Sequence, residues 1–278
     1  MTKDAAMSRT ALTHLLITRF NLDYGDLYPY SEAWMEHRMA LFERYCLPSV
    51  RRQRGAGFAW RVYFDRTRTA RHEARMRALL DRPGLHPVFV DSPAAMIADL
   101  RAQAPARGLF LTTRLDNDDV LHPDFVRDVQ ARARALAEAG TLPAIVDAPL
   151  ATWWREGADR ARQYRSEMVT PFATMVERPG AQGWEAGYWG TGPRTVFIAR
   201  HENLDKRVAY LDHLETPRSL TVLHDQNLSN GRSRFRGAAG WLAAGLRRWT
   251  DRKTCLGRQD TTALLKEFGL SPDRERPD

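Results

Sequence analysis

Cysteine is scarce in this sequence, since a chain of 278 residues contains only Cys46 and Cys255. Two cysteines are too few for a disulfide framework or for a zinc site with four cysteine ligands, so the sequence predicts neither. Cys46 lies in a largely apolar stretch, and we interpret it as a small buried hydrophobic residue.

Long apolar runs are missing as well. No stretch of 18 uncharged apolar residues occurs, so the sequence predicts no segment that crosses a bilayer. Residues 1–10 are polar and lack the apolar run of a signal peptide. The sequence shows no internal repeat and no low-complexity tract. We therefore expect a cytoplasmic protein.

Acidic residues are fewer than basic ones: 34 Asp and Glu against 42 Lys and Arg give a formal net charge of +8. This excess favours an anionic partner, which could be nucleic acid, the phosphates of a nucleotide sugar or an acidic membrane surface. A nucleic-acid-binding protein is one alternative that the charge supports. However, the arginines are spread along the chain and no helix-turn-helix, zinc-finger or RNP signature is present, so we expect no nucleic-acid partner.

Strand and helix patterns alternate over the first half of the chain. We expect strands at 12–20, 58–64, 86–90, 108–115 and 144–146, separated by helices near 31–47, 69–81, 93–103 and 123–140. Strands separated by single helices predict an α/β fold with a doubly wound, mostly parallel sheet and helices on both faces. Ligands of such sheets bind beyond the carboxyl ends of the strands.

The pattern changes after residue 140. One more strand is expected at 219–223, and residues 234–253 have the pattern of a basic amphipathic helix with tryptophans. We therefore divide the chain into a main domain, 1–232, and a C-terminal basic helical segment and tail, 233–278. A helix of this kind can lie on an anionic membrane, which predicts peripheral attachment to the inner face of the cell membrane.

An acidic cluster follows the fourth predicted strand. Asp116, Asp118 and Asp119 repel one another unless a cation or a basic group lies among them. Carboxylates at the edge of a parallel sheet are suitable ligands for Mg²⁺ or Mn²⁺, and such an ion could neutralise a leaving diphosphate. An alternative is a phosphatase of the haloacid-dehalogenase type, in which Asp116 is the nucleophile and Asp118 the general acid.

Several segments together resemble the bacterial family of putative rhamnosyl transferases, which are glycosyltransferases of the GT-A type. These segments are LLITRFNL at 15–22, FERYCLPSV at 42–50, FAWRVYFD at 58–65, RLDNDD at 114–119 and VLHDQNLSN at 222–230. The similarity extends over about residues 12–232. It implies a GT-A (Rossmann-like) fold and transfer of a sugar, with rhamnose as one candidate, from a nucleoside-diphosphate donor to a glycan or lipid acceptor of the cell envelope.

The resemblance also implies roles for individual residues. Asp118 would bind Mn²⁺ or Mg²⁺, and Asp116 would contact the ribose or share the metal. His224 matches a C-terminal histidine that returns to the metal or the diphosphate. The remaining nucleotide-binding positions implied by the matched motifs are Thr18, Arg19, Asp65 and Arg114.

An inverting transferase, which we favour over a retaining one, also needs a carboxylate that takes the proton from the acceptor hydroxyl. Asp212 is our first candidate, by its spacing from Asp118, and Glu185 is the second because aromatic residues surround it. Aromatic rings stack well on the apolar faces of sugars, and the acceptor or sugar candidates are Trp184, Tyr188 and Trp189.

Overall fold

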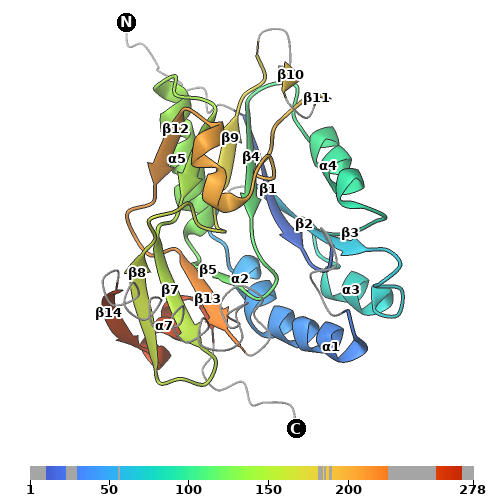
Figure 1. Ribbon diagram of the computed structural model, residues 1–278, viewed down its shortest axis with the longest axis vertical. Helices are drawn as coiled ribbons and strands as arrows, with labels where there is room; N and C mark the ends of the chain where they lie inside the picture. The colour runs from blue at the N-terminus through green and yellow to red at the C-terminus, as the bar shows by residue number, and fades with distance from the viewer. Residues whose placement is uncertain are drawn as a thin grey trace, which may run out of the picture.

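The computed structural model describes residues 11–22, 30–55, 57–180, 184, 186–187, 190–224 and 255–270 (Figure 1). The strands are β1 Leu12–Arg19, β2 Phe58–Asp65, β3 Leu85–Val90, β4 Leu109–Arg114, β5 Val120–Leu121, β6 Ala144–Asp147, β7 Leu150–Arg155, β8 Arg160–Arg165, β9 Thr174–Glu177, β10 Ala186–Gly187, β11 Gly190–Thr191, β12 Tyr210–His213, β13 Ser219–Leu223 and β14 Cys255–Asp260. The α-helices are α1 Glu32–Leu41, α2 Leu47–Arg51, α3 Glu73–Leu79, α4 Pro93–Ala102, α5 Phe125–Glu138 and α7 Thr261–Glu267. A π-helical segment, η1 Phe42–Cys46, joins α1 to α2, and short 3₁₀ turns lie at η2 His201–Asn203 and η3 Asp205–Arg207.

The central sheet has seven strands in the order β12-β6-β9-β4-β1-β2-β3. Strands β1, β2, β3 and β4 pair with one another in parallel, and β6 pairs with β12 in parallel, whereas β9 is antiparallel to both β4 and β6. The prediction of a doubly wound, mostly parallel α/β sheet is therefore confirmed. The reversed strand β9 was not predicted, because it lies in the aromatic region where no clear period is visible.

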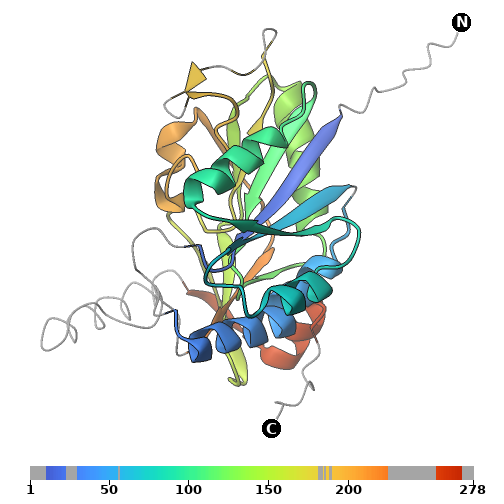
Figure 2. The same cartoon turned by 90° about the vertical axis from the view of Figure 1, so that its right-hand side faces the viewer.

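Side chains of the central strands alternate between two hydrophobic cores, one on each face of the sheet. On β1, Leu16 belongs to the core formed with α1, α2 and α5, while Leu15 and Ile17 face the core that contains Met96 and Leu100 of α4. Helices therefore cover both faces, as Figure 2 shows with α4 in front of the sheet and α5 behind it. Burial on both faces explains why these strands are almost continuously apolar.

The predicted helix starts are confirmed in detail for α1 and α4. The hydroxyl of Ser31 accepts a hydrogen bond from the Trp34 amide at 3.1 Å, and Ser92 accepts one from Ala95 at 3.1 Å. Both serines are therefore N-caps, which satisfy amide groups that the first helical turn leaves without partners. The helix predicted at 31–47 continues through η1 into α2 and ends only at Arg51.

A second sheet, of five strands in the order β14-β8-β7-β13-β5, lies beyond the central one. It encloses a third core with Tyr45, Trp154, Val222 and Phe268. Part of the C-terminal segment thus adds strand β14 to this sheet. The predicted basic helix at 234–253 lies outside the described residues, so the proposed domain division stays a prediction. In the part of the chain that is described, no helix has the length and apolar character required to cross a membrane.

The acidic cluster is the connection between the two sheets. Strand β4 of the central sheet ends at Arg114, and β5 of the second sheet begins at Val120. Strand β5 pairs with β13, whose last residue, Leu223, precedes His224. This pairing brings the ends of two segments that lie about a hundred residues apart to one place, at the carboxyl edge of the central sheet.

Candidate functional site

Asp118 and His224 form the centre of the site. The Nε2 atom of His224 lies 2.9 Å from Oδ2 of Asp118, and both residues are buried, with 7% and 6% of their surface exposed. A carboxylate oxygen and an imidazole nitrogen stay this close only with a proton or a cation between them. The sequence-based prediction that these two residues share a function is consistent with this geometry.

A third group, the guanidinium of Arg38 on α1, completes the centre. Its Nη1 donates to Oδ2 of Asp118 at 2.7 Å and lies 3.4 Å from Nε2 of His224, while its Nη2 donates to Oδ1 of Asn117. Burial by itself would raise the pKa of Asp118, but Arg38 and His224 outweigh it and hold that pKa well below its usual range. Asp118 is therefore an anion whose charge is balanced by groups of this chain.

His37 and Glu156 extend the site on the side of α1 and the second sheet. Nε2 of His37 lies 3.2 Å from Nδ1 of His224. Burial, followed by the charges of His224 and Arg38, lowers the pKa of His37. The Glu156 amide donates to the carbonyl of Leu223 at 3.1 Å, which fixes the β7–β8 turn beside His224. The contact of His37 with Nδ1 of His224 orients the imidazole, so that Nε2 of His224 points towards Asp118.

The Glu156 carboxylate is itself held by two donors from η1. Arg44 Nη1 and the Tyr45 hydroxyl donate to its Oε1 at 2.9 and 2.7 Å. The π-helical turn at Phe42–Cys46 immediately follows the helix that carries His37 and Arg38. One continuous helical stretch therefore supplies hydrogen-bond donors to both Asp118 and Glu156. π-Helical turns are frequent at functional sites.

The other aspartates of the cluster have different surroundings. Asp116 forms an ion pair with Arg114, whose Nη2 lies 3.1 Å from each carboxylate oxygen. Asp119 is 5% exposed, and burial together with the charges of Asp118 and Asp116 raises its pKa well above the usual value. Asn117 donates to the Phe20 carbonyl at 2.9 Å, which ties the cluster to the end of β1.

Two of the three predicted metal ligands, Asp118 and His224, lie close together. Ligand atoms at about 2.1 Å from an octahedral ion are about 3 Å apart when adjacent, which matches the 2.9 Å between Asp118 and His224. A carboxylate with an imidazole suits Mn²⁺. Asp116 turns towards Arg114 instead and does not complete a three-residue group. The residues present thus fit a cation held by two side chains, with Asp116 nearby.

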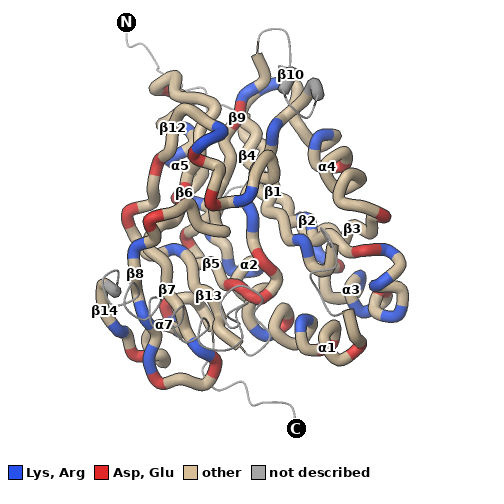
Figure 3. The backbone as a smooth tube through the Cα atoms, viewed as in Figure 1, with Lys and Arg blue, Asp and Glu red and all other residues tan. Residues whose placement is uncertain are grey.

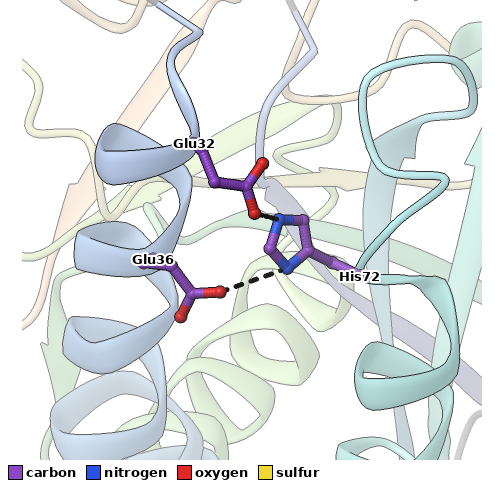
Figure 4. Close-up of side chains that lie close together, drawn as sticks. All are labelled: Glu32, Glu36 and His72. Atoms are coloured by element: carbon purple, nitrogen blue, oxygen red, sulfur yellow. Dashed lines mark ion pairs between the residues drawn. The ribbon is translucent and has the colours of Figure 1, made fainter.

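A different trio, Glu32, Glu36 and His72, has all three potential ligand atoms within 4.8 Å of one another (Figure 4). Nε2 of His72 lies 3.0 Å from Glu32 and its Nδ1 lies 3.5 Å from Glu36. The second oxygen of Glu36 pairs with Arg75 at 3.0 Å. Since each ring nitrogen already faces a carboxylate, the trio is explained as a set of ion pairs that fastens α1 to the start of α3.

The predicted nucleotide residues lie at the ends of the first two strands. Thr18 is fully buried and accepts a hydrogen bond from Trp60 Nε1 at 2.9 Å, so its side chain belongs to the core. Arg19 lies over the ring of Phe197, 5.1 Å from its centroid. Asp65 accepts from the Thr67 hydroxyl at 2.7 Å and stabilises the turn after β2. Arg19 and Asp65 therefore lie at the carboxyl edge, as the strand pattern predicts.

The predicted base and sugar residues are not all brought to Asp118. Asp212 lies on β12, at the edge of the sheet, where Nη2 of Arg132 on α5 donates to its Oδ1 at 3.0 Å and the two side chains form an ion pair. The structure describes no contact between Asp212 and Asp118. Trp184 packs edge-on against Phe110, with ring centroids 6.0 Å apart. The remaining candidates, Glu185, Tyr188 and Trp189, lie outside the described residues.

Sequence reasoning gave no role to Arg38 or His37, and it did not single out Asn117 or Glu156. The pair His37-Arg38 interrupts the apolar pattern of a helix whose buried face includes Met35 and Met39, but polar residues on the outer face of a helix are common. Only the approach of α1 to the end of β13 gives them a role.

Basic residues are spread along the part of the chain that the structure describes. Figure 3 shows Lys and Arg distributed over helices, strands and turns, with acidic residues interspersed. Many of the arginines pair with carboxylates, for example Arg61 with Asp99 at 2.6 Å and Arg218 with Asp128 at 2.6 Å.

Comparison with known proteins gives one family. A family model described as putative rhamnosyl transferase matches residues 26–234. No curated protein matches the chain.

Among solved structures, S. aureus TarS matches at 11% identity and a TM-score of 0.38, over 78% of this chain and 37% of TarS. TarS 1–349 matches at 11% identity and a TM-score of 0.40, over 76% of this chain and 60% of that one. TarS 1–349 in complex with UDP-GlcNAc matches at 11% identity and a TM-score of 0.39, over 80% and 62%. This chain therefore spans less than two thirds of those proteins, and the likeness is too weak to indicate what it binds.

Proposed function

Because the chain belongs to the family of putative rhamnosyl transferases, we propose that it moves a sugar from a nucleoside-diphosphate donor to a glycan or lipid acceptor of the cell envelope. The observation that carries the proposal is the meeting of Asp118 and His224, 2.9 Å apart at the carboxyl edge of the sheet. Family membership favours this reaction over a haloacid-dehalogenase phosphatase. Rhamnose as the donor sugar rests on the family description alone.

Asp118 and His224 would hold a divalent cation, Mn²⁺ or Mg²⁺. When bound, such an ion supplies a positive charge that stabilises the diphosphate as it leaves. Asp118 is suited to this task because its carboxylate stays ionised, and His224 because His37 holds its second ring nitrogen. The protein's part is to keep both ligands in place before the donor arrives.

The nucleotide would lie along the ends of β1, β2 and β4. Arg114 keeps Asp116 oriented at the edge of the sheet, where that carboxylate is in position to accept from a ribose hydroxyl. Asp65 is the candidate for the base, and Arg19 lines the same edge. Thr18 would contribute only through its backbone, because its side chain is buried.

The acceptor hydroxyl must lose a proton as it attacks the sugar, and a carboxylate within reach would take it. Glu156 lies beside His224, through the hydrogen bond between its amide and the Leu223 carbonyl, and Arg44 and Tyr45 orient its carboxylate. We therefore propose Glu156 ahead of Asp212, which lies on the edge strand β12 and has no described contact with Asp118 or His224. Glu185 stays a further candidate.

A thermal-shift panel tests the proposal. The protein is heated with nucleoside diphosphates and nucleotide sugars, each with and without Mn²⁺. A ligand present at a hundred times its Kd stabilises the folded chain by about 2.7 kcal/mol, which raises the Tm of a chain this size by roughly 5–10 °C. We expect such a rise with one nucleotide class, dependent on Mn²⁺ and lost in Asp118→Ala.

Asp91→Ala is the matched control, since Asp91 follows β3 at the same edge but its side chain is 76% exposed and pairs with Arg66. It should keep the full rise in Tm. If no nucleotide raises the Tm of the unaltered protein, or if Asp118→Ala responds as the unaltered protein does, the proposed function is wrong.

A further inference from the structure

Arg38 contacts the two atoms that would bind the cation in the proposed function, Oδ2 of Asp118 and Nε2 of His224. Its Nη1 lies 2.7 Å from Oδ2 of Asp118 and 3.4 Å from Nε2 of His224. A guanidinium is always charged in a protein, and like charges repel strongly where water is excluded. Arg38, with 12% of its side chain exposed, therefore cannot stay in this place when a divalent cation binds.

The guanidinium is also incompletely satisfied where it lies. Arg38 has five N–H donors, and its buried Nε has no hydrogen-bond partner among the residues that the structure describes. Nη1 and Nη2 use acceptors on the loop between β4 and β5, Asp118 and Asn117. A diphosphate offers several anionic oxygens that match the planar fork of a guanidinium, and it would reach the same edge of the sheet.

We infer that Arg38 is a two-position residue that neutralises Asp118 in the empty site and pairs with the diphosphate of the donor once a cation has taken its place. This inference rests on the proposed function and adds a regulation to it. Because Arg38 competes with the cation, the site binds the ion weakly alone and tightly together with the nucleotide. Cation and donor therefore bind cooperatively, and the free enzyme keeps its carboxylate neutralised between reactions.

The test measures two affinities in the full-length protein. The Kd of Mn²⁺ without nucleotide is obtained from the free-ion signal in electron paramagnetic resonance, and the Kd of the nucleoside diphosphate is measured by calorimetry at saturating Mn²⁺. Arg38→Gln removes the charge but keeps an amide that can donate to Asp118. We expect Mn²⁺ to bind about tenfold more tightly, and the nucleoside diphosphate about tenfold more weakly, than to the unaltered protein.

Arg44→Gln is the matched control, because Arg44 follows on the same helical stretch and donates to Glu156 instead. It removes the same charge, and the Mn²⁺ affinity should change less than about twofold, since charges at a distance are screened. Arg38→Lys is the second variant if Arg38→Gln unfolds. It keeps the charge without the fork, so Mn²⁺ should stay weakly bound while the nucleotide still loses affinity.

Opposite shifts of the two affinities in Arg38→Gln would support the inference. An Mn²⁺ affinity that is unchanged or weaker, or a nucleotide affinity that is unchanged, would overturn it and leave Arg38 as a structural ion pair. Failure of the proposed function is recognised separately, because then the unaltered protein itself would bind none of the nucleotides, and the inference would fall with it.

Discussion

His14 in the middle of β1 is expected to make the stability of the protein depend on pH. The residue is 1% exposed, its Nε2 lies 2.8 Å from Thr113 Oγ1, and its Nδ1 lies 3.4 Å from Gln130. Thr113 in turn shares a hydrogen bond of 2.6 Å with Thr174. No carboxylate takes part in these contacts, and burial lowers the pKa of His14 from 6.5 to about 3.

The magnitude follows from the difference between the folded and unfolded pKa. Between pH 6.5 and about 3 the unfolded chain binds a proton at His14 that the folded chain does not, so stability is complete above pH 6.5 and falls as the pH decreases. Relative to pH 7.5, the loss due to His14 is about 1 kcal/mol at pH 5.5 and about 3 kcal/mol at pH 4.5.

Urea unfolding followed by tryptophan fluorescence at these three pH values measures the effect. The comparison is between the unaltered protein and His14→Gln, because other titrating groups contribute equally to both and cancel. The free energy of unfolding of His14→Gln should depend less steeply on pH by the amounts given above. Thr113→Val is the control: it removes one hydrogen bond of the imidazole, so it should lower stability at every pH but keep the slope.

Two results would refute this reasoning. If His14→Gln loses as much stability between pH 7.5 and 4.5 as the unaltered protein, His14 is not the group that titrates. If Thr113→Val also weakens the pH dependence of the free energy of unfolding, then the hydrogen bond, and not burial of the ring, determines the pKa of His14.

The remaining predictions concern the proposed base and one backbone position. Glu156→Gln should reduce release of nucleoside diphosphate from the donor by about 10²-fold with little change in donor affinity, whereas Asp212→Asn should reduce it less than tenfold; steady-state kinetics with the reverse order would return the role to Asp212. Gly108→Ala should cost about 3 kcal/mol in urea unfolding, because φ is +89° and an added Cβ would lie 2.2 Å from the Ala11 carbonyl oxygen. Gly140→Ala, at φ +70° with nothing within 4 Å of the added Cβ, should cost only about 1 kcal/mol, so equal losses would contradict the steric argument.

The sequence was sufficient to predict the central part of the fold. Strands β1 and β4 are buried on both faces, so their apolar runs are nearly continuous, and serine caps mark the starts of α1 and α4. These signals are local, because each depends on residues within one or two turns of the chain. The same reasoning placed the acidic cluster at the carboxyl edge of the sheet, since parallel strands bring their ends together.

The second sheet could not be predicted in the same way. Strand β7 mixes apolar residues with Thr152 and Arg155, β8 contains three exposed arginines, and β5 has only two residues, so their hydrophobic periods are weak. Their pairing is with partners distant in sequence, such as β13 with β7. A pairing of this kind is decided by which edges remain available after the central sheet has formed.

The residues of the site also fall into two groups, those found from the sequence and those found only from the structure. Asp118 could be found from the sequence because its acidic cluster follows a recognisable strand, and His224 because it directly follows another strand and matches a histidine of the family that the chain resembles. Arg38 and Glu156 could not, because an arginine on a helix and a glutamate in a turn have no distinctive neighbours in the chain. Only the tertiary structure decides that Arg38 neutralises Asp118, since a charge interaction depends on distance in space. Arg38 of α1 and His224 at the end of β13 are 186 positions apart in the sequence.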